Sequence, residues 1–117
     1  MKEFMMLFRA ETGTEEEFAN QSPEQMKAVM ARWDDWLGGI AAQDKLLGTN
    51  ALNHEGKIVK ADGSVTDGPY VALKEMVGGY TMVKAEDFNE AVALTKGCPM
   101  FDMGGTVEVR DIIVYER

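Results

Sequence analysis

Apolar residues occur in short runs and at helical spacings along the chain, and their pattern predicts four strands and two helices. The apolar run 4–8 is too short for a helix of ordinary length, so we expect a strand that is apolar on both faces. Residues 74–83 predict a second strand of this kind. Its two expected faces consist of Met76, Tyr80 and Met82 and of Val77, Thr81 and Val83. Both strands therefore need cover on two sides.

Two segments carry helix signals. Ser22-Pro23-Glu24-Gln25 combines an N-cap serine, a proline in the first turn and a glutamine three residues after the cap, so a helix should begin there and end near Ala42. Its expected inner stripe is Met26, Val29, Met30, Trp33, Trp36, Leu37 and Ile40. A second helix should open at Glu86-Asp87 and stop before Gly97. Its expected inner stripe is Phe88, Ala91, Val92 and Thr95.

The remaining segments predict strands and turns. Residues 45–52 and 106–115 predict the other two strands, and the charged residues in 106–115 are typical of an edge strand. Residues 57–65 predict a hairpin excursion that turns at Asp62-Gly63. Asp67-Gly68-Pro69 then predicts a stiff turn that would hold the Asp67 carboxylate in one orientation.

The order of these elements is β-α-β-β-α-β, which predicts a ferredoxin-like α+β fold with an antiparallel four-stranded sheet in one domain of residues 1–117. The strands at 4–8 and 74–83 would be central. Two helices cover one face of such a sheet, and the other face has a flat area of roughly 350–400 Å². An apolar patch of that size is near the largest that a monomer exposes, so we expect a homodimer that pairs two sheets.

Composition limits the partners and cofactors. A net charge of −8 argues against a nucleic-acid or anionic membrane partner, and the short apolar run at 4–8 fits neither a signal peptide nor a membrane span, so a cytoplasmic location is expected. Cys98 is the only cysteine and follows a predicted helix end, where the helix dipole opposes a thiolate, so we expect a packed thiol. His54 lies in a polar turn, where a solvated side chain is expected. Metal-ligand clusters and cofactor-binding motifs are not found, so no metal and no cofactor is expected.

Five short motifs together resemble those of the YCII-related family, also known as DGPF-domain proteins, over nearly the whole chain. The motifs are Ser22-Pro23-Glu24, Asp67-Gly68-Pro69-Tyr70, Lys74-Glu75, Gly78-Gly79-Tyr80 and Val107-Glu108-Val109-Arg110. The resemblance implies a dimeric α+β barrel. It also implies a histidine in the first helix that would pair with the turn aspartate, but Trp33 occupies that position here. An indole cannot exchange a proton as an imidazole does, so this chain lacks the second member of that pair.

Two functions remain open. The first is a small homodimer that binds an organic molecule in a pocket between sheet and helices, with cofactor-free acid/base chemistry at Asp67 on its rim. The expected lining residues are Trp33, Tyr70, Tyr80 and Met82. The second is a non-catalytic interaction or sensory domain, because relatives occur fused or adjacent to regulators of transcription. Under the second function Asp67 would be a turn carboxylate bonded to backbone N–H groups, and Trp33 would be core packing.

Overall fold

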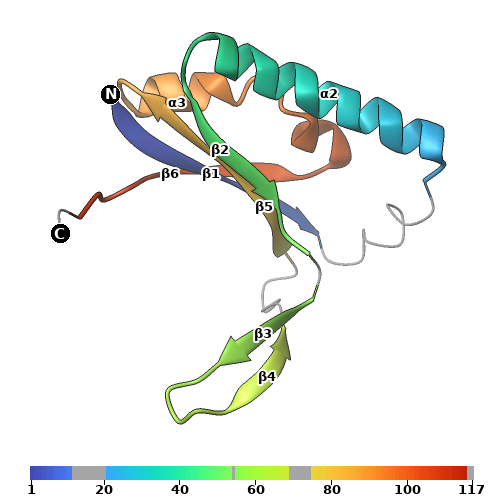
Figure 1. Cartoon of the computed structure of the whole chain (residues 1–117), viewed down its shortest axis with the longest axis vertical. Coiled ribbons are helices and arrows are strands. Elements are labelled where there is room, and N and C mark those ends of the chain that lie inside the picture. Colours follow the sequence, from blue (N-terminus) through green and yellow to red (C-terminus); the bar gives the residue numbers. More distant parts are fainter. Residues whose placement is uncertain (12–20, 54, 69–74, 116–117) are drawn as a thin grey trace.

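The computed structural model describes residues 1–11, 21–53, 55–68 and 75–115. Within them the chain forms an α+β fold, in which two helices lie on one side of a four-stranded antiparallel sheet (Figure 1). The sheet consists of β1 (Lys2–Glu11), β2 (Leu46–Ala51), β5 (Glu75–Ala85) and β6 (Thr106–Asp111), in the order β2-β5-β1-β6. The helices are α2 (Pro23–Ala42) and α3 (Phe88–Leu94), and a 3-10 helix spans Pro99–Met103. This arrangement is compatible with the ferredoxin-like fold, and the strands that are apolar on both faces are central, as expected.

The first helix begins and ends where its sequence signals place it. The Ser22 hydroxyl accepts a hydrogen bond from the Gln25 N–H at 3.1 Å, and the Gln25 side chain accepts one from the Ser22 N–H at 2.8 Å. This reciprocal pair satisfies two backbone donors that have no partner within the helix. After Ala42 the chain leaves the helix through Asp44, which has a left-handed φ of 58°.

The core fills the space between the helices and one face of the sheet. Its buried residues are Phe4, Met6, Phe8, Trp36, Ile40, Val83, Ala85, Ala91, Cys98 and Met100. The inner stripes of the helices are narrower than expected, because Met26 and Met30 of α2 and Phe88 and Val92 of α3 are exposed. Figure 1 shows the first turns of α2 extending past the strands of the sheet.

A β-bulge changes which residues share a face of β5. The register with β1 shifts between Phe8 and Arg9, so Gly78 is left without a partner in β1. Met76 therefore pairs with Ala10, which packs on the helix side of the sheet. The expectation that Met76 shares a face with Tyr80 and Met82 is wrong, because one inserted residue reverses every side chain beyond it.

Gly78 and Gly79 are neighbours in β5, but they differ in their surroundings. A Cβ atom at Gly79 would lie 2.9 Å from the Asn50 carbonyl oxygen, whereas nothing lies within 4 Å at Gly78, which has no left-handed φ. Gly79→Ala should lower the free energy of unfolding by about 1 kcal/mol through this clash with the backbone of an edge strand. Gly78→Ala should raise it by about 0.4–1 kcal/mol, because alanine restricts the unfolded chain. Chemical denaturation measures both changes in the free energy of unfolding. Changes of the same sign would contradict the register of β5 with its neighbouring strands.

The hairpin between β2 and β5 forms a separate arm. β3 (Gly56–Val59) pairs with β4 (Val65–Gly68) through a turn in which Gly63 has a φ of 89°, so the predicted hairpin is confirmed. Asp67 and Gly68 belong to β4 rather than to a turn, and Pro69 and Tyr70 lie outside the described residues. Figure 1 shows the arm projecting away from the sheet and both helices. The radius of gyration, 15.9 Å, accordingly exceeds the value of about 13 Å for a compact chain of this length.

The last strand is an edge strand, as expected, but it ends at Asp111 rather than at residue 115. Asp111 pairs with Phe4, and the Ile112 N–H donates to the Glu3 carbonyl oxygen at 3.0 Å. In the same register residue 113 lies opposite Lys2, the first residue of β1, so residues 114 and 115 lie beyond that strand. Ile113, Val114 and Tyr115 are exposed.

Candidate functional site

The face of the sheet opposite the helices has an apolar centre. Met5 pairs with Met82 across β1 and β5, and Leu7 pairs with Tyr80. These four half-buried side chains form the open-face cluster. They alternate with the core residues along each strand, and alternate residues of a strand point to opposite faces. The open-face cluster therefore lies on the side of the sheet that neither helix covers.

Polar side chains surround this apolar centre. The Tyr80 hydroxyl oxygen accepts a hydrogen bond from the Asn50 side-chain amide at 2.9 Å, which leaves the hydroxyl proton for another acceptor. On the other side Arg9 Nε donates to Glu108 Oε1 at 2.9 Å, and Arg110 contacts the second oxygen of Glu108 at 3.4 Å. An apolar centre with a polar rim is the usual anatomy of an interface or a ligand site.

Trp33 lies on the other side of the sheet. Its ring makes edge-to-face contacts with Phe8 at 5.1 Å and with Trp36 at 5.7 Å between centroids, and it packs against the core. The structure thus brings Tyr80 and Met82 together but separates both from Trp33 by the thickness of the sheet. A single pocket of one protomer cannot be lined by all three, so the expected pocket is corrected on this point. Tyr70 lies outside the described residues.

Asp67 lies on the arm. Its side chain is 88% exposed and forms a cross-strand ion pair with Lys57, its direct partner in β3. The described residues therefore give the carboxylate a lysine partner rather than the backbone N–H groups of a turn. An ion pair this exposed adds little to stability, because water screens it. In one protomer Asp67 stands away from the helices that would hold the pocket (Figure 1).

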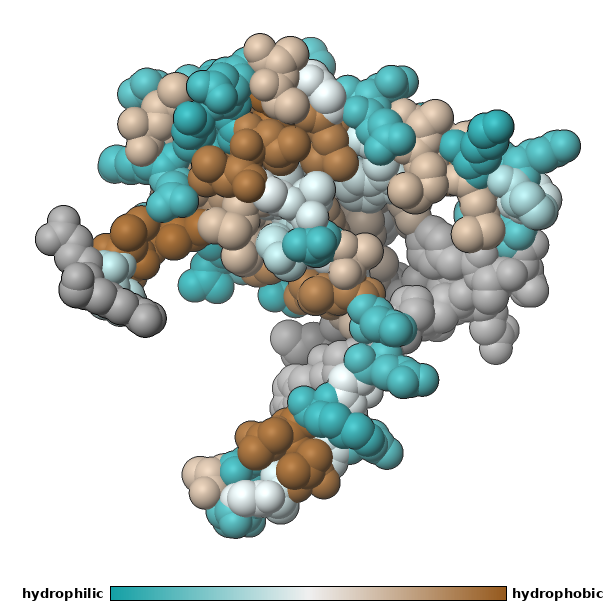
Figure 2. Space-filling view, in the orientation of Figure 1, coloured by the Kyte–Doolittle hydropathy of each residue, from teal (hydrophilic) through white to brown (hydrophobic). Residues whose placement is uncertain are grey.

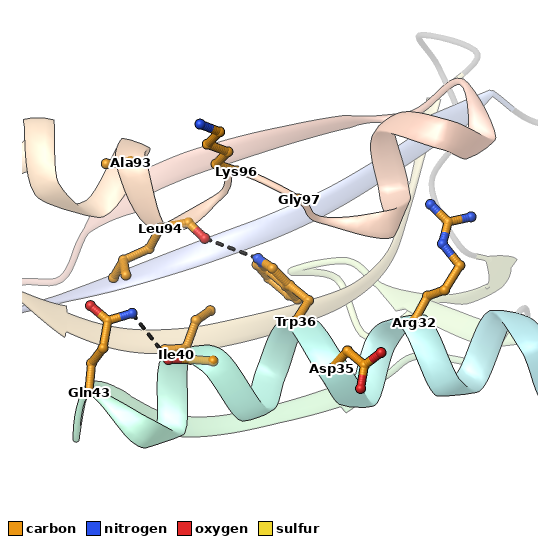
Figure 3. A pocket seen from close by; sticks show the side chains of 10 residues that line it. Arg32, Asp35, Trp36, Ile40, Gln43, Ala93, Leu94, Lys96 and Gly97 are labelled. Atoms are coloured by element: carbon orange, nitrogen blue, oxygen red, sulfur yellow. Dashed lines mark hydrogen bonds between the residues drawn. The ribbon is translucent and has the colours of Figure 1, made fainter.

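A cleft of about 480 Å³ lies between α2 and α3. Trp36, Ile40 and Leu94 form its apolar floor, and Figure 3 shows the charged ends of Arg32 and Lys96 pointing away from that floor. The indole N–H of Trp36 already donates to the Leu94 carbonyl oxygen at 3.0 Å. The Gln43 amide donates to the Gly39 carbonyl oxygen at 3.1 Å, and Arg32 forms an ion pair with Asp102, so these polar groups at the cleft already have partners. None of the sequence-predicted site residues lines it.

Sequence reasoning missed Met5, Leu7, Asn50, Arg9 and Glu108 as members of the site. The alternation within residues 4–8 does separate Met5 and Leu7 from their neighbours. Nothing in the sequence, however, indicates which of the two sets faces the helices. The contacts of Asn50 with Tyr80 and of Arg9 with Glu108 depend on strand register, which joins residues 30 and 99 positions apart.

Cys98 is buried in the core, and burial raises the pKa of its thiol, so the prediction of a packed thiol is confirmed. His54 lies outside the described residues. In the part of the chain that the structure describes, no group of three or more His, Cys, Asp or Glu residues is arranged to hold a metal ion. No helix in that same part is both long and apolar enough to cross a membrane.

These features define an α+β domain whose four-stranded sheet is covered by helices on one face and presents an apolar cluster on the other. The family model of the YCII-related domain matches residues 3–116, which is nearly the whole chain. The chain therefore belongs to the YCII-related family, and the resemblance seen in its motifs is confirmed. Among curated proteins, none matches this chain.

Proposed function

We propose that this YCII-related domain is a homodimer that binds a small organic molecule at the open face of its sheet. The observation that carries the proposal is the open-face cluster, because four apolar side chains lie on a face that neither helix covers. Removing apolar surface from water is the main favourable term in association. Two such faces in contact form a dimeric α+β barrel, and the ligand lies between them.

The side chains of the open face favour a particular ligand chemistry. Met5 and Met82 adapt to irregular apolar shapes, because the thioether chain is flexible and polarisable. The Tyr80 hydroxyl oxygen accepts a hydrogen bond from Asn50, so the hydroxyl proton can be donated to a ligand. Arg9 adds a positive charge at the rim, although Glu108 balances it in part. A small molecule with an apolar body and one acceptor group, such as a ketone or a carboxylic acid, matches this arrangement.

Binding is better supported than acid/base catalysis within one protomer. Trp33 packs in the core, where relatives would carry a histidine, and Asp67 pairs with Lys57 on the arm. Neither residue lies with Tyr80 and Met82 on the open face. The packed Trp33 also favours the second candidate function, a non-catalytic interaction or sensory domain, in which the dimer itself is the functional unit.

A ligand screen by thermal shift tests the proposal. Ketones and carboxylic acids with aromatic or aliphatic bodies should include compounds that raise the melting temperature, because a ligand of the native state stabilises it by mass action. Met82→Ala should lower the affinity for these compounds at least fivefold, since it removes apolar contact at the site. Met26→Ala is the matched control, because Met26 is exposed on α2. Isothermal titration calorimetry gives the affinities, and light scattering checks that each variant keeps its mass.

Two outcomes would contradict ligand binding at the open face. One is that no compound of either class raises the melting temperature. The other is that Met82→Ala and Met26→Ala bind the active compounds equally well. A stable dimer without any ligand would leave the interaction or sensory function as the better account.

A further inference from the structure

One face of the arm is exposed among the residues that the structure describes. Val59 and Val65 lie directly opposite each other near its tip and are 69% and 59% exposed. Lys57 and Asp67 form the next pair on the same side, because residues two apart in a strand share a face. These four residues are called the valine face. In Figure 2 the apolar surface of the arm stands apart from that of the body.

On the opposite face of the arm, the apolar side chain is half-buried. Ile58 pairs with Thr66 and is half-buried, and its Cγ1 would lie 3.1 Å from a Cβ atom at Gly68. Ile58 thus closes over the glycine pair Gly56–Gly68 at the base of the arm. The two faces therefore differ, because Ile58 is half-buried whereas Val59 and Val65 are exposed.

A two-stranded hairpin is at best marginally stable alone in water, so an arm of this kind needs a surface to pack against. The interface area of the proposed dimer indicates which surface the arm packs against. The four strands contain 33 residues, so two open sheet faces provide roughly 1,000 Å² of flat area, about two thirds of the 1,600 Å² that a stable interface usually buries. We therefore expect the arm to pack against a second copy of the chain. There it adds the contact area that the two sheet faces lack.

We propose that each arm packs its valine face against the partner protomer, so that two arms are exchanged across the twofold axis of the dimer. This inference rests on the proposed homodimer. In such a dimer every contact occurs twice, so both valine faces are covered at once. Lys57 and Asp67 share that face and reach the partner together with the valines.

Photocrosslinking tests whether the arm contacts the partner. A benzophenone amino acid at position 65 should yield a covalent species of about twice the 12.9 kDa chain mass after irradiation. The same amino acid at position 66 is the control, because Thr66 is exposed on the other face of the arm. Failure to form covalent dimer from position 65, or equal yields from the two positions, would overturn the proposal.

A pair of substitutions tests whether the contact contributes to dimerisation. Val59→Lys with Val65→Glu removes the apolar pair, keeps the net charge and retains the hairpin through a cross-strand ion pair. The dissociation constant of the dimer should rise at least tenfold, as measured by sedimentation equilibrium. Ala61→Lys with Thr66→Glu is the matched control, since it places the same charges on exposed positions of the arm outside the valine face, and it should change the constant less than threefold.

The outcomes separate this inference from the proposed function. A dimer that resists the valine-face substitutions but dissociates on Leu7→Glu would overturn the arm exchange and keep the sheet-to-sheet dimer. A monomeric wild-type protein would overturn both.

Discussion

Leu7→Glu is expected to convert the proposed homodimer into monomers. Leu7 pairs with Tyr80 at the centre of the open-face cluster, so a carboxylate there would be buried against apolar side chains of the partner. Burying an unpaired charge costs several kcal/mol, and a loss of about 3–4 kcal/mol weakens a dimer about 100- to 1,000-fold. Light scattering at micromolar concentration should give twice the 12.9 kDa chain mass for the wild type and the single chain mass for the variant.

Two further substitutions make this result specific to the open face. Ala28→Glu adds the same charge on the exposed side of α2 and should leave the dimer intact. Met6→Glu should instead unfold the protein, because Met6 is fully buried under the helices although it neighbours Leu7 in the chain. A Leu7→Glu variant that stays dimeric, or a wild type that is monomeric, would rule out the barrel.

Trp33→His is expected to lower the free energy of unfolding by about 1–3 kcal/mol. The substitution removes aromatic area that contacts Phe8 and Trp36, and it places a polar ring against the core. Urea denaturation measures the loss. Asp34→His is the control, since Asp34 is exposed on the same turn of α2 and its replacement should be nearly neutral.

The same variant tests whether an ancestral catalytic geometry persists. The new histidine should titrate independently of Asp67, because Asp67 lies on the arm with Lys57. NMR titration of Trp33→His with and without Asp67→Asn would show this as an unchanged histidine pKa. Full stability together with a histidine pKa that moves when Asp67 is neutralised would mean that the two positions face each other in the dimer.

Local signals in the sequence were sufficient for the order and ends of most elements. The bounds of α2 follow from the Ser22 cap and the apolar spacing as far as Ile40, because capping and periodicity act within a few residues. The turn at Gly63 follows in the same way. The end of β6 did not follow, because residues 112–115 have strand character, and only the register with β1 shows that residues 114 and 115 extend beyond Lys2, where β1 begins.

The candidate site was predicted only in part. Tyr80 and Met82 were chosen from the sequence and do share a face, yet the expected pocket also included Trp33, which lies across the sheet. Periodicity shows which residues of a strand point the same way, but not toward which layer. The bulge at Gly78 reverses Met76; a glycine within a strand is typical of a bulge, but the sequence does not show where the register with β1 shifts.

By itself, the sequence of this protein determined the fold class, the helix start at Ser22 and the family, because these depend on short-range chemistry and on motifs. The tertiary structure alone decided that Leu7 rather than Met6 faces outward, that Trp33 belongs to the core, and that Asp67 pairs with Lys57 on an arm. Each of these facts depends on strand register or on packing between residues far apart in the chain. Such contacts form only when the elements meet, since the local sequence of a strand or hairpin does not specify the surface that it will cover.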